Sequence, residues 1–295
     1  MFRIGKLFHL THVVSDLDAV DTWYDEVFSV CRFYRAYMQA AVREASLLTI
    51  GDFVMEPVQL ARVPGAEKSP IGKFYARFGQ RFHSIAWYVE SVEETFAELS
   101  QHRIRLYDLV GNVVKEPLET TAVWTHPKDT HALLEFALIG NFSIDARLQP
   151  GWSAAFWREQ HPLGIERASH ITVLVRDLLE AKAVYQDMLG GKLLHEEETP
   201  GQKRSVFFAV GEDTVIEAAQ PLSAASPEGR DLEQAGEGIY AVTFKTKDLK
   251  RAADFLQSQK QRIEWQGTDW LVLNRDDAFG MGIGFTQRRI PNDLR

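Results

Sequence analysis

The sequence lacks the marks of several large classes of protein. Its single cysteine, Cys31, cannot form a disulfide within the chain, and one thiol cannot build a thiolate metal cluster. No stretch reaches the roughly 18 consecutive apolar residues of a membrane-spanning helix. The opening residues, 1–14, lack the apolar run and the small-residue cleavage site of a signal peptide. We therefore expect a cytoplasmic protein with no membrane partner.

An excess of positive charge is also missing. The chain has 33 basic and 41 acidic residues, which gives a formal net charge of −8. A nucleic-acid-binding protein normally presents a basic face, so no nucleic-acid partner is expected. The 295 residues, 45% of them hydrophobic, are enough for about two domains with buried cores.

One pattern occurs four times along the chain. Each copy is a short apolar strand followed by Asp or Ser and an amphipathic helix, and several short β-like runs come after each helix. The strands are HLTHVVSD at 9–16, HSIAWYVE at 83–90, HITVLVRD at 170–177 and AVTFKTKD at 241–248. One helix among several strands in each unit predicts an α+β fold of four tandem βαβββ modules.

Extra length between the second and third modules indicates where the chain divides. This stretch contains Pro150, Trp152, Trp157 and Pro162, and its two tryptophans suggest that it packs on a domain surface. We predict an N-terminal two-module domain at 1–141, a linker at 142–166 and a C-terminal two-module domain at 167–295.

Histidine and glutamate recur in this repeat. His9, His83 and His170 begin the first strand of their modules, and Glu56, Glu135 and Glu217 lie in the last strand of the same modules. The fourth module has Ala241 and Gly284 instead. A carboxylate within an apolar strand is costly to bury unless something positive compensates it.

Two histidines and two carboxylates are a typical ligand set for a divalent transition metal. The N-terminal pair of modules supplies all four as His9, Glu56, His83 and Glu135. The C-terminal pair supplies only His170 and Glu217, which favours a relic or a hydrogen-bonded pair over a second metal centre. We predict one metal site, in the N-terminal half.

The repeat resembles the vicinal oxygen chelate superfamily, which includes glyoxalases, bleomycin-resistance proteins and extradiol dioxygenases. The marks are the His-x6-Asp openings at His9 and His170 and the segments TVIEAAQP, SPIGKFYARFGQRFHSIAWYV and HPKDTHALLEF. The resemblance implies that the modules pair into two half-open barrels. It also implies that His9, Glu56, His83 and Glu135 hold a divalent metal, with Ni, Zn, Co, Mn and Fe as candidates.

The predicted function is that of a metal-dependent, glyoxalase-like lyase or isomerase. Its small-molecule substrate would be chelated through two neighbouring oxygens, and Glu56 or Glu135 would serve as the catalytic base. One alternative is an extradiol-type dioxygenase with iron on His9, His83 and Glu135. Another is a resistance-type protein that binds a small molecule without turnover.

Residues near the predicted ligands extend the site. Strand alternation places Thr11 on the face of His9 and Trp87 on that of His83, so both are candidates for the substrate pocket. Basic residues before the second repeated strand could meet a substrate carboxylate, although a solvated face is the more frequent outcome; they are Lys68, Lys73, Arg77 and Arg81. A homodimer is possible, because modules of this kind can pair between chains.

Overall fold

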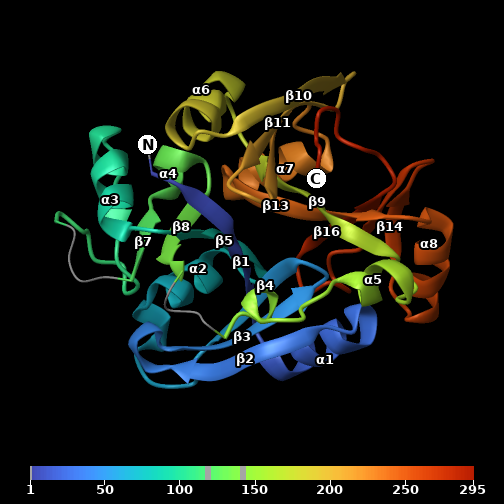
Figure 1. The fold of residues 1–295 in the computed structure, drawn as a ribbon, viewed down its shortest axis with the longest axis horizontal. Coiled ribbons are helices and arrows are strands. Elements are labelled where there is room, and N and C mark those ends of the chain that lie inside the picture. The colour runs from blue at the N-terminus through green and yellow to red at the C-terminus, as the bar shows by residue number, and fades with distance from the viewer. Residues whose placement is uncertain (1, 117–120, 140–143) are drawn as a thin grey trace.

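The computed structural model describes residues 2–116, 121–139 and 144–295 (Figure 1). It contains two eight-stranded mixed sheets, one from each half of the chain, with helices packed on them. The predicted α+β class and its four βαβββ modules in two barrel-like halves are confirmed. The predicted boundary between 141 and 142 lies outside the described residues.

The N-terminal half forms the first sheet, with strand order β2-β3-β4-β1-β5-β8-β7-β6. Strand β1 runs parallel to β4 and antiparallel to β5, so the two modules join at the centre of the sheet. Its main elements are β1 (Ile4–Val14), α1 (Leu17–Phe28), β2 (Cys31–Met38), β3 (Arg43–Ile50), β4 (Phe53–Leu60), α2 (Pro70–Phe78), β5 (Arg81–Val89), α3 (Val92–Gln101), β6 (Leu106–Tyr107), β7 (Ala122–Thr125), α4 (Pro127–Thr130) and β8 (Leu133–Leu138).

The C-terminal half repeats this arrangement strand for strand, in the order β10-β11-β12-β9-β13-β16-β15-β14. A short helix, α5 (Ala155–Glu159), precedes it. Its elements are β9 (Ile165–Leu174), α6 (Leu178–Lys182) continuing as a π-helical turn (Ala183–Met188), β10 (Lys192–Thr199), β11 (Lys203–Val210), β12 (Thr214–Pro221), α7 (Pro227–Ala235), β13 (Gly238–Thr246), α8 (Leu249–Ser258), β14 (Ile263–Gln266), β15 (Trp270–Leu273) and β16 (Gly282–Thr286).

Side-chain caps fix where the first helix of each module begins. Asp16, Ser91, Asp177 and Asp248 are the N-cap residues of α1, α3, α6 and α8, and each accepts a hydrogen bond from a backbone N–H of the first turn. Such a bond satisfies a donor that the helix leaves without an intrahelical partner. The caps therefore also fix the register at which each first strand ends.

One hydrophobic core joins the two halves, which lie against each other in Figure 1. Phe28 and Phe53 of the N-terminal half both contact Phe244 of β13. The segment between the sheets packs onto the N-terminal half, where Trp157 Nε1 donates to the carbonyl of Phe28 at 2.8 Å. Within the described ranges, no helix is long and apolar enough to cross a membrane.

Candidate functional site

Two irregularities in the pairing of β1 with β5 shape the site. Leu7 pairs with Trp87 and His9 with Ala86, so β1 has one extra residue, Phe8, between them. Leu10 pairs with Ile85 but His12 with Phe82, so β5 has an extra residue at 83–84. Each irregularity is a β-bulge, which redirects side chains locally and breaks the simple alternation of faces.

The bulges change which residues of the modules are equivalent. Thr11 of β1 pairs with Glu56, and in the second module Ala86 of β5 pairs with Glu135. The residue two positions before Ala86 is Ser84, whereas the residue two positions before Thr11 is His9. Counting back from the helix caps gives the same match, because His9 precedes Asp16 by the same distance as Ser84 precedes Ser91. Ser84, and not His83, therefore stands where His9 stands in the first module.

This correction affects the predicted repeat of histidines. In the four repeated segments Glu90 stands opposite Asp16, but the helix is capped by Ser91, the serine that follows the second segment. His83 is consequently one residue out of register with His9 and His170. Ala241, by contrast, does occupy the equivalent position in the fourth module, since it precedes the Asp248 cap by that same distance.

Three of the four predicted ligands form a buried polar cluster on the inner face of the first sheet. His9 is central: its Nδ1 lies 3.6 Å from Glu56 Oε2, and its Nε2 lies 3.8 Å from Glu135 Oε2. Thr11 Oγ1 donates to Glu56 Oε2 at 2.8 Å. The side chains of this cluster are almost fully buried; they are His9, Thr11, Glu56 and Glu135.

Burial and charge give these groups distinct protonation behaviour. Burial lowers the pKa of His9 to about 4. Burial alone would raise the pKa of Glu56, but the charge of Arg43 and the Thr11 hydrogen bond lower it. Burial, reinforced by the charge of Glu56, raises the pKa of Glu135 to about 8. Glu56 is therefore the more acidic of the two carboxyl groups, and the imidazole of His9 is neutral at pH 7.

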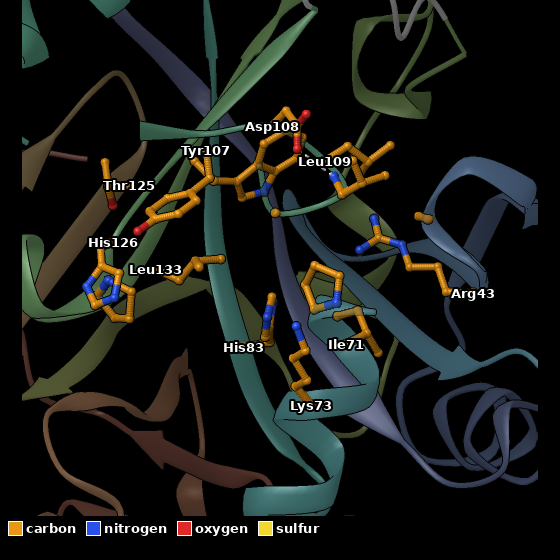
Figure 2. A pocket seen from close by; sticks show the side chains of 16 residues that line it. Arg43, Ile71, Lys73, His83, Tyr107, Asp108, Leu109, Thr125, His126 and Leu133 are labelled. Carbon is orange, nitrogen blue, oxygen red and sulfur yellow. Dashed lines mark hydrogen bonds between the residues drawn. The ribbon is translucent and has the colours of Figure 1, made fainter. Parts of the chain in front are cut away.

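A cavity of about 490 Å³ lies next to this cluster. Arg43 reaches into it from one side, His83 and Lys73 from below, and Tyr107 and His126 from the far side (Figure 2). His9, Glu56 and Glu135 are not among its lining residues. The predicted glutamates thus lie outside the wall of the cavity.

Three lining residues connect the cavity to the cluster. Arg43 Nη2 donates to Glu56 Oε1 at 3.1 Å, and Trp124 Nε1 donates to Glu135 Oε2 at 3.0 Å. His83 Nδ1 contacts Ser84 Oγ at 3.3 Å, and Ser84 in turn donates to Thr11. The buried carboxylates therefore hold in place the side chains that a bound molecule would touch.

The guanidinium of Arg43 has a donor without a hydrogen-bond partner among the described residues. The side chain is 8% exposed, and its Nε is buried without a hydrogen-bond partner among the described residues. Only Nη2 has a partner there. A buried donor without an acceptor is costly, and the hydrogen bond between Arg43 and Glu56 offsets part of that cost.

The residues present do not fit a divalent metal. In the described part of the chain, no three His, Cys, Asp or Glu side chains are arranged to hold a metal ion. Both oxygens of Glu56 already accept hydrogen bonds, one of them from a guanidinium that would repel a metal cation at that position. His83 is displaced from the register that a fourth ligand would need.

The C-terminal half has a reduced version of the same cluster. Thr172 Oγ1 donates to Glu217 Oε2 at 2.6 Å, as Thr11 does to Glu56, and His170 Nε2 lies 3.4 Å from the same oxygen. Lys203 Nζ donates to Glu217 Oε1 at 2.5 Å. His170 and Glu217 thus belong to a hydrogen-bonded ion-pair cluster.

The two predicted pocket residues do not line the cavity. Thr11 is 1% exposed and belongs to the buried cluster. Trp87 is fully buried in the core shared by the two halves, where its Nε1 donates to Thr214 Oγ1 at 3.0 Å. The bulge at 83–84 reverses the face on which Ile85 and Trp87 lie, so the predicted aromatic wall at Trp87 is wrong.

Sequence reasoning missed Arg43, Trp124 and Lys203. A signal for two of them was present, since the strands before those of Glu56 and Glu217 both begin with a basic residue, Arg43 in β3 and Lys203 in β11. Trp124 carried no pattern of its own. Lys73, noted as one of several basic residues, does line the cavity.

Comparisons with known proteins agree with this architecture. The model of the Glyoxalase/Bleomycin resistance protein/Dioxygenase superfamily matches residues 167–267. The Bacillus subtilis protein YqjC is 30% identical over 130 residues, covering 44% of this chain and 89% of that protein. An ethylmalonyl-CoA/methylmalonyl-CoA epimerase of Cereibacter sphaeroides is 31% identical over 105 residues, covering 35% and 78%.

A solved structure shares the fold over its whole length. A mutant 4-hydroxymandelate synthase from Streptomyces coelicolor superposes with a TM-score of 0.65 at 11% identity, covering 99% of this chain and 96% of that one. The chain belongs to the glyoxalase/bleomycin resistance protein/dioxygenase superfamily. Its relatives include enzymes, among them the epimerases, which are isomerases.

Proposed function

We propose that this protein is an enzyme of the isomerase or lyase type that moves a proton on a small molecule bound in the N-terminal cavity. The observation that carries the proposal is the coupling between cavity and cluster: Arg43 and Trp124 line the cavity and are each held by a buried glutamate. Groups fixed in this way are pre-organised, which is what stabilisation of a transition state requires. The epimerase relatives favour an isomerase over a lyase.

Two residues are assigned to the chemistry. His83 lines the cavity, and its Nδ1 is directed to Ser84, so Nε2 is the atom that would take a proton from the substrate carbon. Arg43 would bind the carbonyl oxygen on which negative charge then develops. The carbanion would then take a proton from water on its other face, while the imidazolium of His83 returns its proton to solvent, so that the epimerisation leaves atoms and electrons unchanged.

Glu56 and Glu135 are positioning residues in this proposal. Glu56 orients Arg43, and Glu135 orients Trp124. A base role for either glutamate would need a side-chain movement that brings it into the cavity. The divalent metal implied by the family does not enter the proposal, because the donors do not fit one. For the same reason the dioxygenase with iron on His9, His83 and Glu135 is not proposed.

Proton transfer can be tested without knowing the substrate. The protein is incubated in D2O with a panel of acyl-CoA thioesters, 2-oxo acids and hemithioacetals, and loss of the proton next to the carbonyl is followed by NMR. We expect exchange with at least one compound that is lost in His83→Ala. Saturable binding without exchange by any compound would favour the non-catalytic binding protein.

A second comparison separates base from positioning residue. If His83 is the base, Glu135→Gln keeps a hydrogen-bond acceptor for Trp124 and should retain most of the exchange rate. If Glu135 is the base, the same variant should lose exchange while His83→Ala keeps it. Whichever of the two variants, His83→Ala or Glu135→Gln, loses exchange should still bind the substrate, as measured by calorimetry, if it lacks only the base.

A further inference from the structure

Each half of the chain has a basic side chain at the equivalent position of its barrel. Arg43 is the first residue of β3 and pairs with Leu60, four residues after Glu56. Lys203 is the first residue of β11 and pairs with Pro221, four residues after Glu217. The two basic residues are therefore equivalent in the repeat, although one is an arginine and the other a lysine.

Each cation neutralises the glutamate of its module. Arg43 Nη2 lies 3.1 Å from Glu56 Oε1, and Lys203 Nζ lies 2.5 Å from Glu217 Oε1. Both carboxylates are nearly inaccessible to solvent, Glu56 at 4% and Glu217 at 1%. A buried carboxylate needs a compensating positive charge, and these side chains supply it from within the protein.

The position facing each glutamate from the neighbouring module has lost its nitrogen ligand. Ser84 stands there in the N-terminal half and Ala241 in the C-terminal half. A metal ion would thus find fewer ligands and a competing cation in both places. Both halves lack the nitrogen ligand, and both have a basic side chain beside the glutamate. The same substitution of ligand by cation therefore does not depend on the placement of one side chain.

We infer that Arg43 and Lys203 take the place of a metal ion, so that this chain is a metal-independent member of its superfamily. In the N-terminal half the side chain of Arg43 also lines the cavity, where its positive charge faces a bound ligand. In the C-terminal half Lys203, Ser205 and Thr172 all donate to Glu217, which makes that cluster structural. The inference concerns the charge of the two sites and stands apart from the proposed activity.

The first test is the metal content of the full-length protein, produced in medium supplemented with Zn, Ni, Co and Mn and purified without an affinity metal. We expect much less than one metal ion per chain, with no difference between wild type and Glu56→Gln. About one metal ion per chain that is lost in Glu56→Gln or His9→Ala would overturn the inference.

The second test rebuilds the ligand set. Arg43→Ala combined with Ser84→His removes the internal cation and places an imidazole where His9 has its counterpart. Titration with Co²⁺, followed by its visible absorption, should give saturable binding of about one ion, which His9→Ala in the same background abolishes. No binding by this variant, once circular dichroism shows that it is folded, would mean that the cation does not occupy a metal position.

A matched control changes the net charge by the same amount as Arg43→Ala combined with Ser84→His. Arg35→Ala also removes one arginine, from the neighbouring strand β2, where its partners are Asp18 and Asp21 of α1. Combined with Ser84→His it should bind no Co²⁺, because Arg43 remains. Equal binding by the control variant would contradict a specific role of Arg43.

Discussion

The guanidinium of Arg43 lies 3.1 Å from the carboxylate of Glu56, and both residues are buried, although Arg43 also lines the N-terminal cavity. This pair replaces the expected metal with a charge that belongs to the protein. It also links the inside of the sheet to the cavity, because Arg43 contacts both.

Removing Arg43 should destabilise the fold. Arg43→Met leaves the buried Glu56 carboxylate without its counter-charge, a change that typically costs about 3–5 kcal/mol. Urea unfolding of the variant and of wild type measures the free energy of unfolding. Adding Glu56→Gln to Arg43→Met should recover most of the loss. If Arg43→Met lost less free energy of unfolding than the exposed control Arg35→Ala, the buried Arg43–Glu56 pair would not stabilise the fold.

A second buried pair holds the bulge at His9. Arg147 donates from Nη2 to the carbonyl of Leu7 at 2.6 Å and to Asp145 Oδ2 at 2.7 Å. Tyr88 donates to the same Asp145 oxygen at 3.1 Å. Arg147→Ala should therefore cost about 3–5 kcal/mol, the usual loss when one partner of a buried pair is removed.

The Arg147 variant should also weaken ligand binding in the cavity, because the Phe8–His9 bulge loses its support. Arg158→Ala, on the exposed side of α5, is the control and should change neither quantity. Unfolding by urea and calorimetric titration with a ligand from the proton-exchange panel measure the two effects. Unchanged stability of Arg147→Ala would show that the bulge does not depend on this contact.

Two tryptophans should respond differently to the same substitution. Trp87→Phe loses the hydrogen bond to Thr214 in the core and should cost about 1 kcal/mol of stability without changing ligand affinity. Trp124→Phe loses the hydrogen bond to Glu135 at the cavity and should weaken ligand binding or exchange. A change in ligand affinity for Trp87→Phe would restore that residue to the substrate pocket.

The contact between the halves should depend on pH. His131 Nδ1 lies 2.9 Å from Glu237 Oε2. Burial lowers the pKa of His131, but the hydrogen bond and charge of Glu237 outweigh it, so the net pKa lies above 6.5. Burial raises the pKa of Glu237, but the contacts with His131 and Arg176 outweigh it, so the net pKa lies below 4.5.

The direction of the pH effect follows from these shifts. The contribution of His131 is complete below pH 6.5 and is lost as pH rises through its raised pKa. The contribution of Glu237 is complete above pH 4.5 and is lost as pH falls through its lowered pKa. The coupling energy of a His131→Gln and Glu237→Gln double-mutant cycle should peak between these values. A coupling that grows above pH 8 would contradict the pair.

Much of the fold could be predicted from the sequence because its signals are local. The apolar strands, the caps at Asp16, Ser91, Asp177 and Asp248, and the helical spacing after them recur four times. Two eight-stranded sheets of identical order follow from that repeat. Local patterns of this kind are the most reliable part of reading a sequence.

The site could be predicted only in part, because bulges and long-range contacts decide it. His9, Glu56 and Glu135 do come together, but the bulge at 83–84 shifts His83 and Trp87, and its trace in the sequence is the spacing between Ser84 and the Ser91 cap. Arg43 lies 13 residues from Glu56 along the chain, and only the antiparallel pairing of β3 with β4 shows that they meet. Strand register of this kind is set by tertiary packing.

The most direct test of the account is deuterium exchange into a panel substrate in D2O, with the protein first treated with EDTA and the chelator kept present. If Arg43 provides the positive charge of the site, wild type keeps its exchange rate under chelation, while Arg43→Ala and His83→Ala lose it. Exchange that disappears with EDTA and returns with Co²⁺ or Zn²⁺ would contradict the claim that Arg43 provides the positive charge of this site.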